Sequence, residues 1–202
     1  MSIRTSIASV AAATAFAVTA SAGAQVIAVD YTGSVAPDFE FDAFGGNTTP
    51  GPDGLTAIIP GVDAPASNFG GTGTNVSLDA NPVPAAGSTI NVTAKLEDGN
   101  VGDTLVVAFI EDGEVFSYGF ATADLNGSTF TTLSLPIESF FFNSGDGAFS
   151  GTGITEASFQ TPFGGTDALA VTVANISLTA IPEPASLGLL SVAGLGLVRR
   201  RR

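Results

Sequence analysis

Residues 89–120 read TINVTAKLEDGNVGDTLVVAFIEDGEVFSYGF, and this stretch carries the strongest strand signal of the chain. In residues 89–96 every second residue is apolar, which places Ile90, Val92, Ala94 and Leu96 on one face of a strand. Alternation of this kind is typical of a strand with one face in the core and the other in solvent. We therefore expect these four side chains to be buried.

The second half of the stretch predicts a hairpin. Residues 104–110 are almost continuously apolar, and residues 115–120 place three aromatic side chains on one side of a strand. Between these segments stands Asp112-Gly113, a pair that tolerates the positive φ angles of a tight two-residue turn. The three aromatic residues are Phe116, Tyr118 and Phe120.

The same pattern continues on both sides of this stretch. Further strands are predicted at residues 26–31, 129–135, 153–160 and 167–178. In the last of these, the apolar spacing lengthens from two to three after Val173, which predicts a bulge around Ala174-Asn175. Residues 38–73 are rich in Gly and Pro, and only residues 55–59 form an apolar run there. Nine or ten short strands separated by turns predict an all-β fold, a β-sandwich of the jelly-roll type.

The first 24 residues have the three parts of a secretory signal peptide. Arg4 stands in a short n-region, residues 7–19 form an apolar core, and Ala22-Gly23-Ala24 fits the small-residue cleavage motif. We expect cleavage after Ala24, with a second position after Ala22. The alternative is an uncleaved anchor, but the apolar core is shorter than the roughly 20 residues that span a bilayer.

The last 22 residues, IPEPASLGLLSVAGLGLVRRRR at 181–202, also have three parts. Pro182, Glu183 and Pro184 precede an apolar run of fourteen residues, which we expect to form a hydrophobic sorting helix. Because this run is shorter than the roughly 20 residues of a transmembrane helix, it would anchor the chain only transiently. Arginines after such a run stay on the cytoplasmic side, so the part before it lies outside. These arginines are Arg199, Arg200, Arg201 and Arg202.

This tail resembles the PEP-CTERM sorting signal of bacterial surface proteins, because the Pro-Glu-Pro motif, the Gly- and Leu-rich run and the arginines follow in that order. The resemblance implies recognition by a membrane-embedded exosortase, cleavage near Pro-Glu-Pro, and delivery to the cell surface or the extracellular polymer. The secretion machinery and an exosortase are thus expected partners. An ordinary tail anchor is the alternative, and the shortness of the apolar run counts against it.

These two signals divide the sequence into a signal peptide at 1–24, a β-sandwich domain at 25–180 and a sorting signal at 181–202. In the domain, Lys95 is the single basic residue against eighteen acidic ones, so its formal charge is −17. Such a charge repels phosphate backbones and argues against nucleic-acid binding. The chain has no Cys and no His, which removes disulfides, Ser-His-Asp and Cys-His catalysis and the usual zinc sites. A metal would have to be a hard cation bound by oxygen, with calcium the first candidate.

Four segments of the domain carry a second resemblance: Asp38-Phe39-Glu40, residues 89–120, FTTLSLPI at 130–137 and TVANISL at 172–178. They are similar to galactose-binding-like jelly rolls, which occur in carbohydrate-binding modules. The resemblance implies a β-sandwich that binds sugar, and a structural calcium where early and late segments of the chain meet. By position, Glu40 and Asn175 match the calcium ligands, with Asp38 or Asp42 nearby. Solvated carboxylates and an asparagine in a bulge are the alternative for these residues.

Three adjacent phenylalanines, Phe140, Phe141 and Phe142, cannot all face inward from a regular strand. At least one of them should point elsewhere or lie in an irregular loop. They would mark either a contact patch or a loop packed over the end of the sandwich, and we favour the loop.

Two functions of different classes remain. The first is a non-catalytic structural or adhesive component of the cell surface or extracellular matrix, favoured by the absence of Trp and the presence of only two Tyr. The second is a carbohydrate-binding module for an extracellular polysaccharide, which would grip sugar rings with exposed aromatic side chains. No pair of carboxylates stands out for glycoside hydrolysis, so we expect no enzyme activity.

Overall fold

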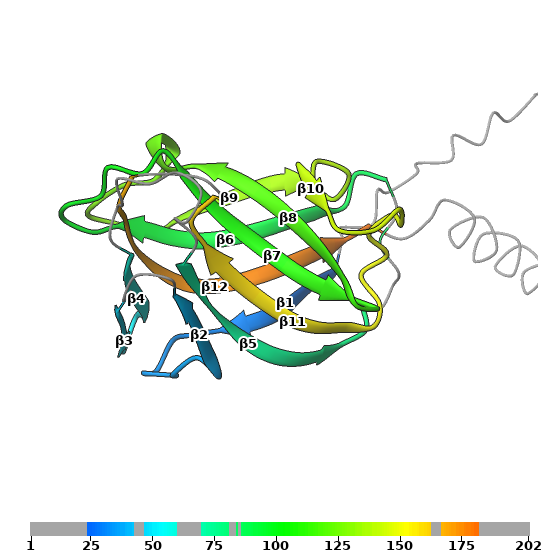
Figure 1. Cartoon of the computed structure of the whole chain (residues 1–202), viewed down its shortest axis with the longest axis horizontal. Coiled ribbons are helices and arrows are strands. Elements are labelled where there is room, and N and C mark those ends of the chain that lie inside the picture. Colours follow the sequence, from blue (N-terminus) through cyan, green and yellow to red (C-terminus); the bar gives the residue numbers. More distant parts are fainter. Residues whose placement is uncertain are drawn as a thin grey trace, which may run out of the picture.

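Two six-stranded sheets stack face to face (Figure 1). The computed structural model describes residues 24–42, 47–59, 70–80, 84, 86–162 and 167–181. In the first sheet the strand order is β3-β4-β12-β6-β9, and β1 also pairs with β12. In the second sheet the order is β10-β8-β7-β11-β5-β2. The all-β sandwich predicted from the sequence is thereby confirmed.

The first sheet is organised around β12 (Leu169–Ala180). One edge of β12 pairs with β6 (Thr89–Leu96), which in turn pairs with β9 (Thr131–Pro136). The other edge pairs first with β4 (Gly54–Ile59) and then with β1 (Ala24–Asp30). The change of partner falls at the predicted bulge, because the register with β6 shifts between Val173 and Asn175. The strand β3 (Asn47–Gly51) pairs with β4.

The second sheet contains the predicted hairpin of β7 (Thr104–Glu111) and β8 (Glu114–Ala121). Asp112 and Gly113 have φ angles of 51° and 84°, as a turn of this kind requires. On the other side of β7 follow β11 (Ile154–Gln160), β5 (Gly70–Leu78) and β2 (Phe39–Asp42). The short β10 (Phe142–Asn143) pairs with β8. A 3-10 turn, η2 (Thr122–Asp124), lies on the path from β8 to β9 in the first sheet.

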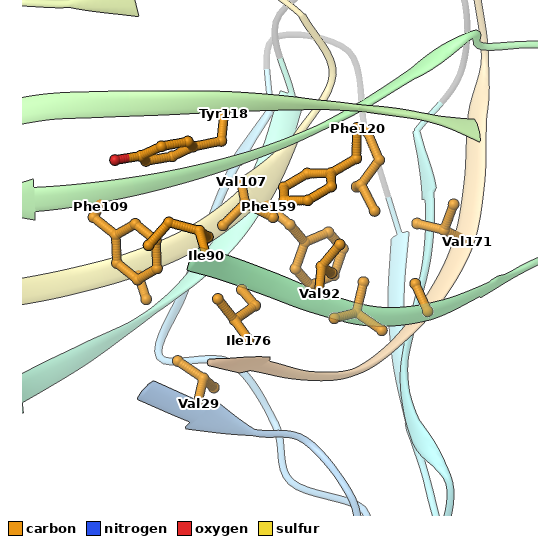
Figure 2. Close-up of a cluster of buried hydrophobic side chains, with 14 of the residues drawn as sticks. Val29, Ile90, Val92, Val107, Phe109, Tyr118, Phe120, Phe159, Val171 and Ile176 are labelled. Atoms are coloured by element: carbon orange, nitrogen blue, oxygen red, sulfur yellow. The ribbon is translucent and has the colours of Figure 1, made fainter. Parts of the chain in front are cut away.

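The core lies between the two sheets, where side chains of both point toward one another (Figure 2). Ile90, Val92 and Ala94 are fully buried as predicted, and Leu96 packs against the core at its rim. The predicted aromatic face of β8 is buried as well. The Tyr118 hydroxyl donates a hydrogen bond of 2.9 Å to the Ile137 carbonyl oxygen, so its polar end has a partner. Burial raises the pKa of Tyr118 far above its usual range.

Twelve strands are present in the described residues, against nine or ten predicted. The strands β2 and β3 lie in the Gly- and Pro-rich region at 38–73, where the sequence shows little alternation, and β5 begins at the end of this region. In β5 Gly73 has a packing role: a Cβ there would lie 2.5 Å from Phe39 Cζ and 2.9 Å from Ser158 Cβ, so a larger residue would displace this ring. The strand is thus stabilised by its neighbours rather than by its own propensity.

The two described ends of the chain lie side by side, because Ala24 pairs with Ala180 in the first sheet. Residues 1–23 of the predicted signal peptide, including Ala22, lie outside the described residues. So do residues 182–202, which hold the Pro-Glu-Pro motif, the predicted sorting helix and the four arginines. In the part of the chain that the structure describes, no helix is long and apolar enough to cross a membrane.

Candidate functional site

A groove of about 690 Å³ opens on the outer face of the second sheet. It lies over β7, β8 and β11 and is flanked by the segment that contains β10. The volume lies within the range of about 300–1,000 Å³ that is usual for ligand sites. The residues that line the groove are Ala108, Ile110, Val115, Ser117, Phe141, Phe142, Glu156, Ser158, Gln160 and Pro162.

Strand alternation explains why these residues face outward. In β7, Val107 and Phe109 enter the core, so Ala108 and Ile110 point to the opposite face. In β11, Ala157 and Phe159 belong to the core, whereas Ser158 and Gln160 line the groove. The aromatic core residues of β8 likewise leave Val115 and Ser117 on the outer face. In each of these strands, alternate side chains therefore face the core and the groove.

Small residues form the floor of the groove. Ser158 pairs with Ala108, and Ala108 pairs with Ser117, so three small side chains lie in one row across β11, β7 and β8. The row ends at β10, where Phe142 pairs with Ser117. On the other side Ser158 pairs with Gly73 of β5. A row of small residues bounded by a large ring leaves a hollow that a sheet of larger side chains would fill.

The three phenylalanines separate into two groups. Phe140 packs inward, with its ring edge-on to Phe116 at a centroid distance of 5.5 Å. Phe141 and Phe142 are 60% and 51% exposed and line the groove. The prediction that at least one ring points away from the core is confirmed. The favoured interpretation, a loop packed over the end of the sandwich, fits Phe140 only, because the other two rings are exposed at the groove.

Three polar side chains that line the groove are unpaired within the described residues. Within the described residues, Ser117, Gln160 and Glu156 make no side-chain hydrogen bond or ion pair. The Ser158 hydroxyl has one long contact, at 3.5 Å from the Ala108 carbonyl oxygen. Partial burial raises the pKa of the Glu156 carboxyl above its ordinary value of 4.5. The site therefore combines two exposed rings with one carboxylate, one amide and hydroxyl groups.

The residues proposed from the sequence as calcium ligands lie on different sheets. Asp38 precedes β2 and Glu40 lies in it, in the second sheet, whereas Asn175 lies in β12 of the first. The Asn75 backbone N–H donates to Asp38 Oδ2 at 2.7 Å, and the Thr48 hydroxyl donates to Glu40. The Asn175 Oδ1 atom is buried and has no hydrogen-bond partner in the described structure. No three acidic side chains of the described residues cluster as a metal site would require.

Sequence reasoning did not find the groove. Its polar residues are scattered over β8 and β11, and nothing in their spacing along the chain brings Ser117 next to Ser158. The adjacent phenylalanines were the one signal that pointed to it. The partners that complete the floor come from strand order, which the sequence pattern does not show.

The fold is similar to that of carbohydrate-binding modules. The family 11 carbohydrate-binding module of the cellulosomal cellulase Lic26A-Cel5E of Clostridium thermocellum matches with a TM-score of 0.54 and 17% identity, covering 81% of this chain and 98% of that chain. The family 11 module from Clostridium thermocellum in complex with a β-1,3-1,4-mixed-linked tetrasaccharide matches with a TM-score of 0.52 and 17% identity. This match covers 81% of this chain and 99% of that chain. At these identities the similarity shows a shared jelly-roll sandwich.

An enzyme is also among the similar structures. The agarase AgWH50C matches with a TM-score of 0.55 and 8% identity, and the match covers 79% of this chain and 25% of that chain. A comparison with curated protein sequences finds no match.

The C-terminal tail matches a family at the sequence level. Residues 180–202 match the PEP-CTERM protein-sorting motif. The sorting signal predicted from the Pro-Glu-Pro motif, the apolar run and the arginines is thereby confirmed. This motif implies exosortase-dependent sorting of an exported protein to the cell surface.

Proposed function

We propose that this is a non-catalytic protein of the cell surface or extracellular matrix whose sandwich binds a polysaccharide chain in the groove of the second sheet. The observation that carries the proposal is the pair of exposed rings, Phe141 and Phe142, beside a floor of small residues. Large apolar side chains that solvent reaches at the rim of a concave site are typical of ligand contacts.

The chemistry of the groove suits a sugar chain. The apolar face of a sugar ring stacks on a flat aromatic ring, and its hydroxyl groups need hydrogen-bond partners around the edge. Phe141 and Phe142 supply the rings, and Gln160, Ser117 and Glu156 supply uncommitted donors and acceptors. The family 11 module with its bound tetrasaccharide supports this proposal by sharing the fold.

A binding role fits the groove better than hydrolysis. Most glycoside hydrolases use two carboxylates, separated by about 5 to 9 Å, on either side of the scissile bond. Of the residues that line the groove, Glu156 is the one carboxylate. The similarity to an agarase covers a quarter of that chain and supports no transfer of its activity.

The two ends of the chain supply the route to the surface. We propose that the signal peptide is cleaved after Ala24, or after Ala22, and that an exosortase cleaves near Pro182-Glu183-Pro184. Arg199 to Arg202 would hold the tail at the inner membrane until that cleavage, because clustered arginines stay on the cytoplasmic side. The sandwich at 25–180 would then be released outside as one domain. The intact mass of the exported protein tests both cleavage positions.

The binding role is tested by affinity electrophoresis of the exported protein in gels that contain polysaccharides. We expect Phe142→Ala to weaken binding by about tenfold, because one stacked ring contributes on the order of 1 kcal/mol beyond its buried area. Ile58→Ala in β4 is the matched control, since Ile58 is also 51% exposed but lies on the first sheet. If the polysaccharide in the gel retards both variants equally, and their melting temperatures are unchanged, the proposal is contradicted.

A structural calcium remains a separate proposal. The unpartnered Oδ1 atom of Asn175 is the observation that supports it, because hard cations bind amide and carboxylate oxygens. Asp38 and Glu40 already accept hydrogen bonds on the other sheet and would have to leave them to join such a site. Titration calorimetry with calcium tests the proposal. No heat and no rise in melting temperature at about millimolar calcium would end it.

A further inference from the structure

We propose that the groove selects uncharged glycans and excludes acidic ones, with Glu156 as the residue that sets this specificity. This inference rests on the proposed polysaccharide binding and names the chemical class of the ligand. Three observations support it: the position of Lys95, which is the single basic residue of the domain, the surroundings of Glu156, and the chemical nature of the remaining groove residues.

The domain has no cation that could pair with an acidic sugar in the groove. Proteins hold carboxylate and sulfate groups with Arg or Lys side chains, often in bidentate contacts. Lys95 is the only Lys, Arg or His between Arg4 and Arg199 in the sequence, so the loops around the groove supply none either. A uronate or a sulfate would enter the groove without a counter-ion.

Lys95 itself is held on the opposite face of the sandwich. Its neighbour Ala94 is buried in the core, so Lys95 points to the outer face of the first sheet, whereas the groove lies on the second. Its Nζ atom lies 3.1 Å from Glu97 Oε1 and 5.6 Å from the centre of the Phe130 ring. The positive charge is thus already committed away from the groove.

Glu156 places a negative charge inside the groove. The register of β11 shifts between Ile154 and Glu156, and after this irregularity Glu156 shares the outer face with Ser158 and Gln160. Its cross-strand neighbours are Asn75 of β5 and Ile110 of β7, and neither carries a charge. Without an ion pair, the carboxylate repels an anionic ligand and accepts hydrogen bonds from hydroxyl groups. Partial burial, which raises the pKa of Glu156, also weakens the screening of this repulsion.

The remaining lining residues suit an uncharged chain. Ala108, Ile110, Val115 and Pro162 offer apolar contact, and Ser117 and Gln160 offer neutral hydrogen-bonding groups. Sugar rings with free hydroxyl groups can use all of these contacts at once. A chain with a charged substituent on each unit would have to place at least one of them near Glu156.

The test compares the same glycan with and without charge. The probes are β-1,3-1,4-glucan and agarose oligosaccharides, each paired with its chemically sulfated form, and the protein is the exported full chain after natural processing. Binding is measured by calorimetry in about 0.5 M sodium chloride, where the Debye length is roughly 4 Å and the general repulsion by the acidic surface is screened. We expect at least one neutral probe to bind and its sulfated form to bind at least about tenfold more weakly.

Two variants assign the discrimination to Glu156. The wild-type affinity for the neutral probe divided by that for the sulfated probe measures the selectivity. We expect Glu156→Gln to reduce this affinity ratio by at least about threefold, because the amide removes the charge and keeps the shape of the side chain. Asp98→Asn makes the same charge change in an exposed turn between β6 and β7 and should leave the affinity ratio unchanged. Melting temperatures show that both variants are folded.

The possible results separate this inference from the binding proposal. Three results would overturn the proposed selectivity and leave polysaccharide binding in place. Sulfated probes could bind as well as neutral ones, sulfated probes alone could bind, or Glu156→Gln and Asp98→Asn could reduce the affinity ratio equally. Failure of all probes, in wild type and variants, would remove the binding proposal and this inference together.

Discussion

At the scale of single residues, two carboxylates of the second sheet differ in how their charge is satisfied. Glu111 is 5% exposed, and both of its oxygens accept the Ser150 backbone N–H at 3.0 Å. The Ser150 hydroxyl and the Gly151 N–H also donate to it. Glu156, by contrast, lines the groove with no such partners. Glu111 therefore holds a loop against the sheet, whereas Glu156 remains available to a ligand.

Removing the Glu111 carboxylate should destabilise the fold. Glu111→Ala leaves the N–H groups of Ser150 and Gly151 without an acceptor, which costs about 2–3 kcal/mol of unfolding free energy. Glu111→Gln keeps one acceptor oxygen and should cost about half as much. Urea denaturation measures both, with Glu138→Ala at an exposed position as the control. A loss below about 0.5 kcal/mol for Glu111→Ala would show that the loop does not depend on this contact.

The pKa of Glu156 predicts a pH-dependent effect on stability. Because burial raises this pKa in the folded state, the folded protein is penalised once the group ionises, so the penalty is absent in acid and appears as the pH rises. Glu156→Gln should therefore raise the melting temperature at about pH 7 and leave it unchanged below about pH 4. An equal rise at both pH values would refute this assignment.

The pKa of Glu97 is shifted in the opposite direction, so its effect on stability has the opposite pH dependence. The Thr172 hydroxyl donates a hydrogen bond of 2.5 Å to Glu97 Oε1, and this bond, with a smaller contribution from Lys95, lowers the pKa of Glu97. Its stabilising contribution is present above the unfolded pKa and disappears as the pH falls through the folded value. Glu97→Gln should thus lower the melting temperature at neutral pH, and this loss should shrink in acid.

At the scale of elements, the bulge in β12 is matched to the turn between β3 and β4. Gly54 begins β4 with a φ angle of 155° and lies directly against the bulge. A Cβ at this position would lie 2.5 Å from the Val173 carbonyl oxygen, a separation that van der Waals contact forbids. The bulge and this glycine therefore form one structural unit where β12 changes its partner from β4 to β1.

Gly54→Ala should disrupt this unit. The backbone of β12 cannot retreat without losing its hydrogen bonds to β6, so we expect a loss of about 2 kcal/mol or more in unfolding free energy. Gly127→Ala is the control, because no atom lies within 4 Å of a Cβ there and Gly127 has no positive φ. Chemical denaturation of both variants provides the measurement. Equal stability of the two would contradict the proposed close contact.

At the scale of the whole molecule, the sandwich depends on pairings between distant parts of the chain. The strand β1 at the start of the described chain pairs with β12 at its end, and β5 pairs with β11. Each pairing requires a long loop to close before its contacts stabilise the fold. Topology of this kind predicts slow folding.

We expect refolding on the order of milliseconds to seconds, as for other β-sandwiches with non-local pairing. Stopped-flow fluorescence of the two buried tyrosines measures the rate. Because β1 occupies the edge of β12 beyond the bulge, deleting residues 25–30 should abolish cooperative unfolding rather than change the rate alone. Refolding within microseconds, or a cooperative transition in the truncated chain, would contradict this view of the topology.

The fold was largely predictable where the sequence alternates. Residues 89–96 and the Asp112-Gly113 hairpin follow from local pattern and turn chemistry, because burial of one face and a positive φ are both properties of a few neighbouring residues. The strand β5 was not predictable, since its glycines have low strand propensity, and the packing of Gly73 against the Phe39 ring and Ser158 is a contact between distant parts of the chain. The groove was not predictable either, because Ser117, Ala108 and Ser158 become neighbours only through the order of the strands in the sheet.

The sequence by itself determined the all-β class, the bulge in β12, the acidic character of the domain at 25–180 with its single basic residue, and the sorting motif at residues 180–202. These depend on composition and on residues close together in the chain. The tertiary structure alone decided which face of which sheet carries the groove, that Phe140 packs against the core while Phe141 and Phe142 are exposed, and that Lys95 lies on the opposite face. Strand order and register decide these features, because hydrogen bonds between distant strands bring together residues that no local pattern relates.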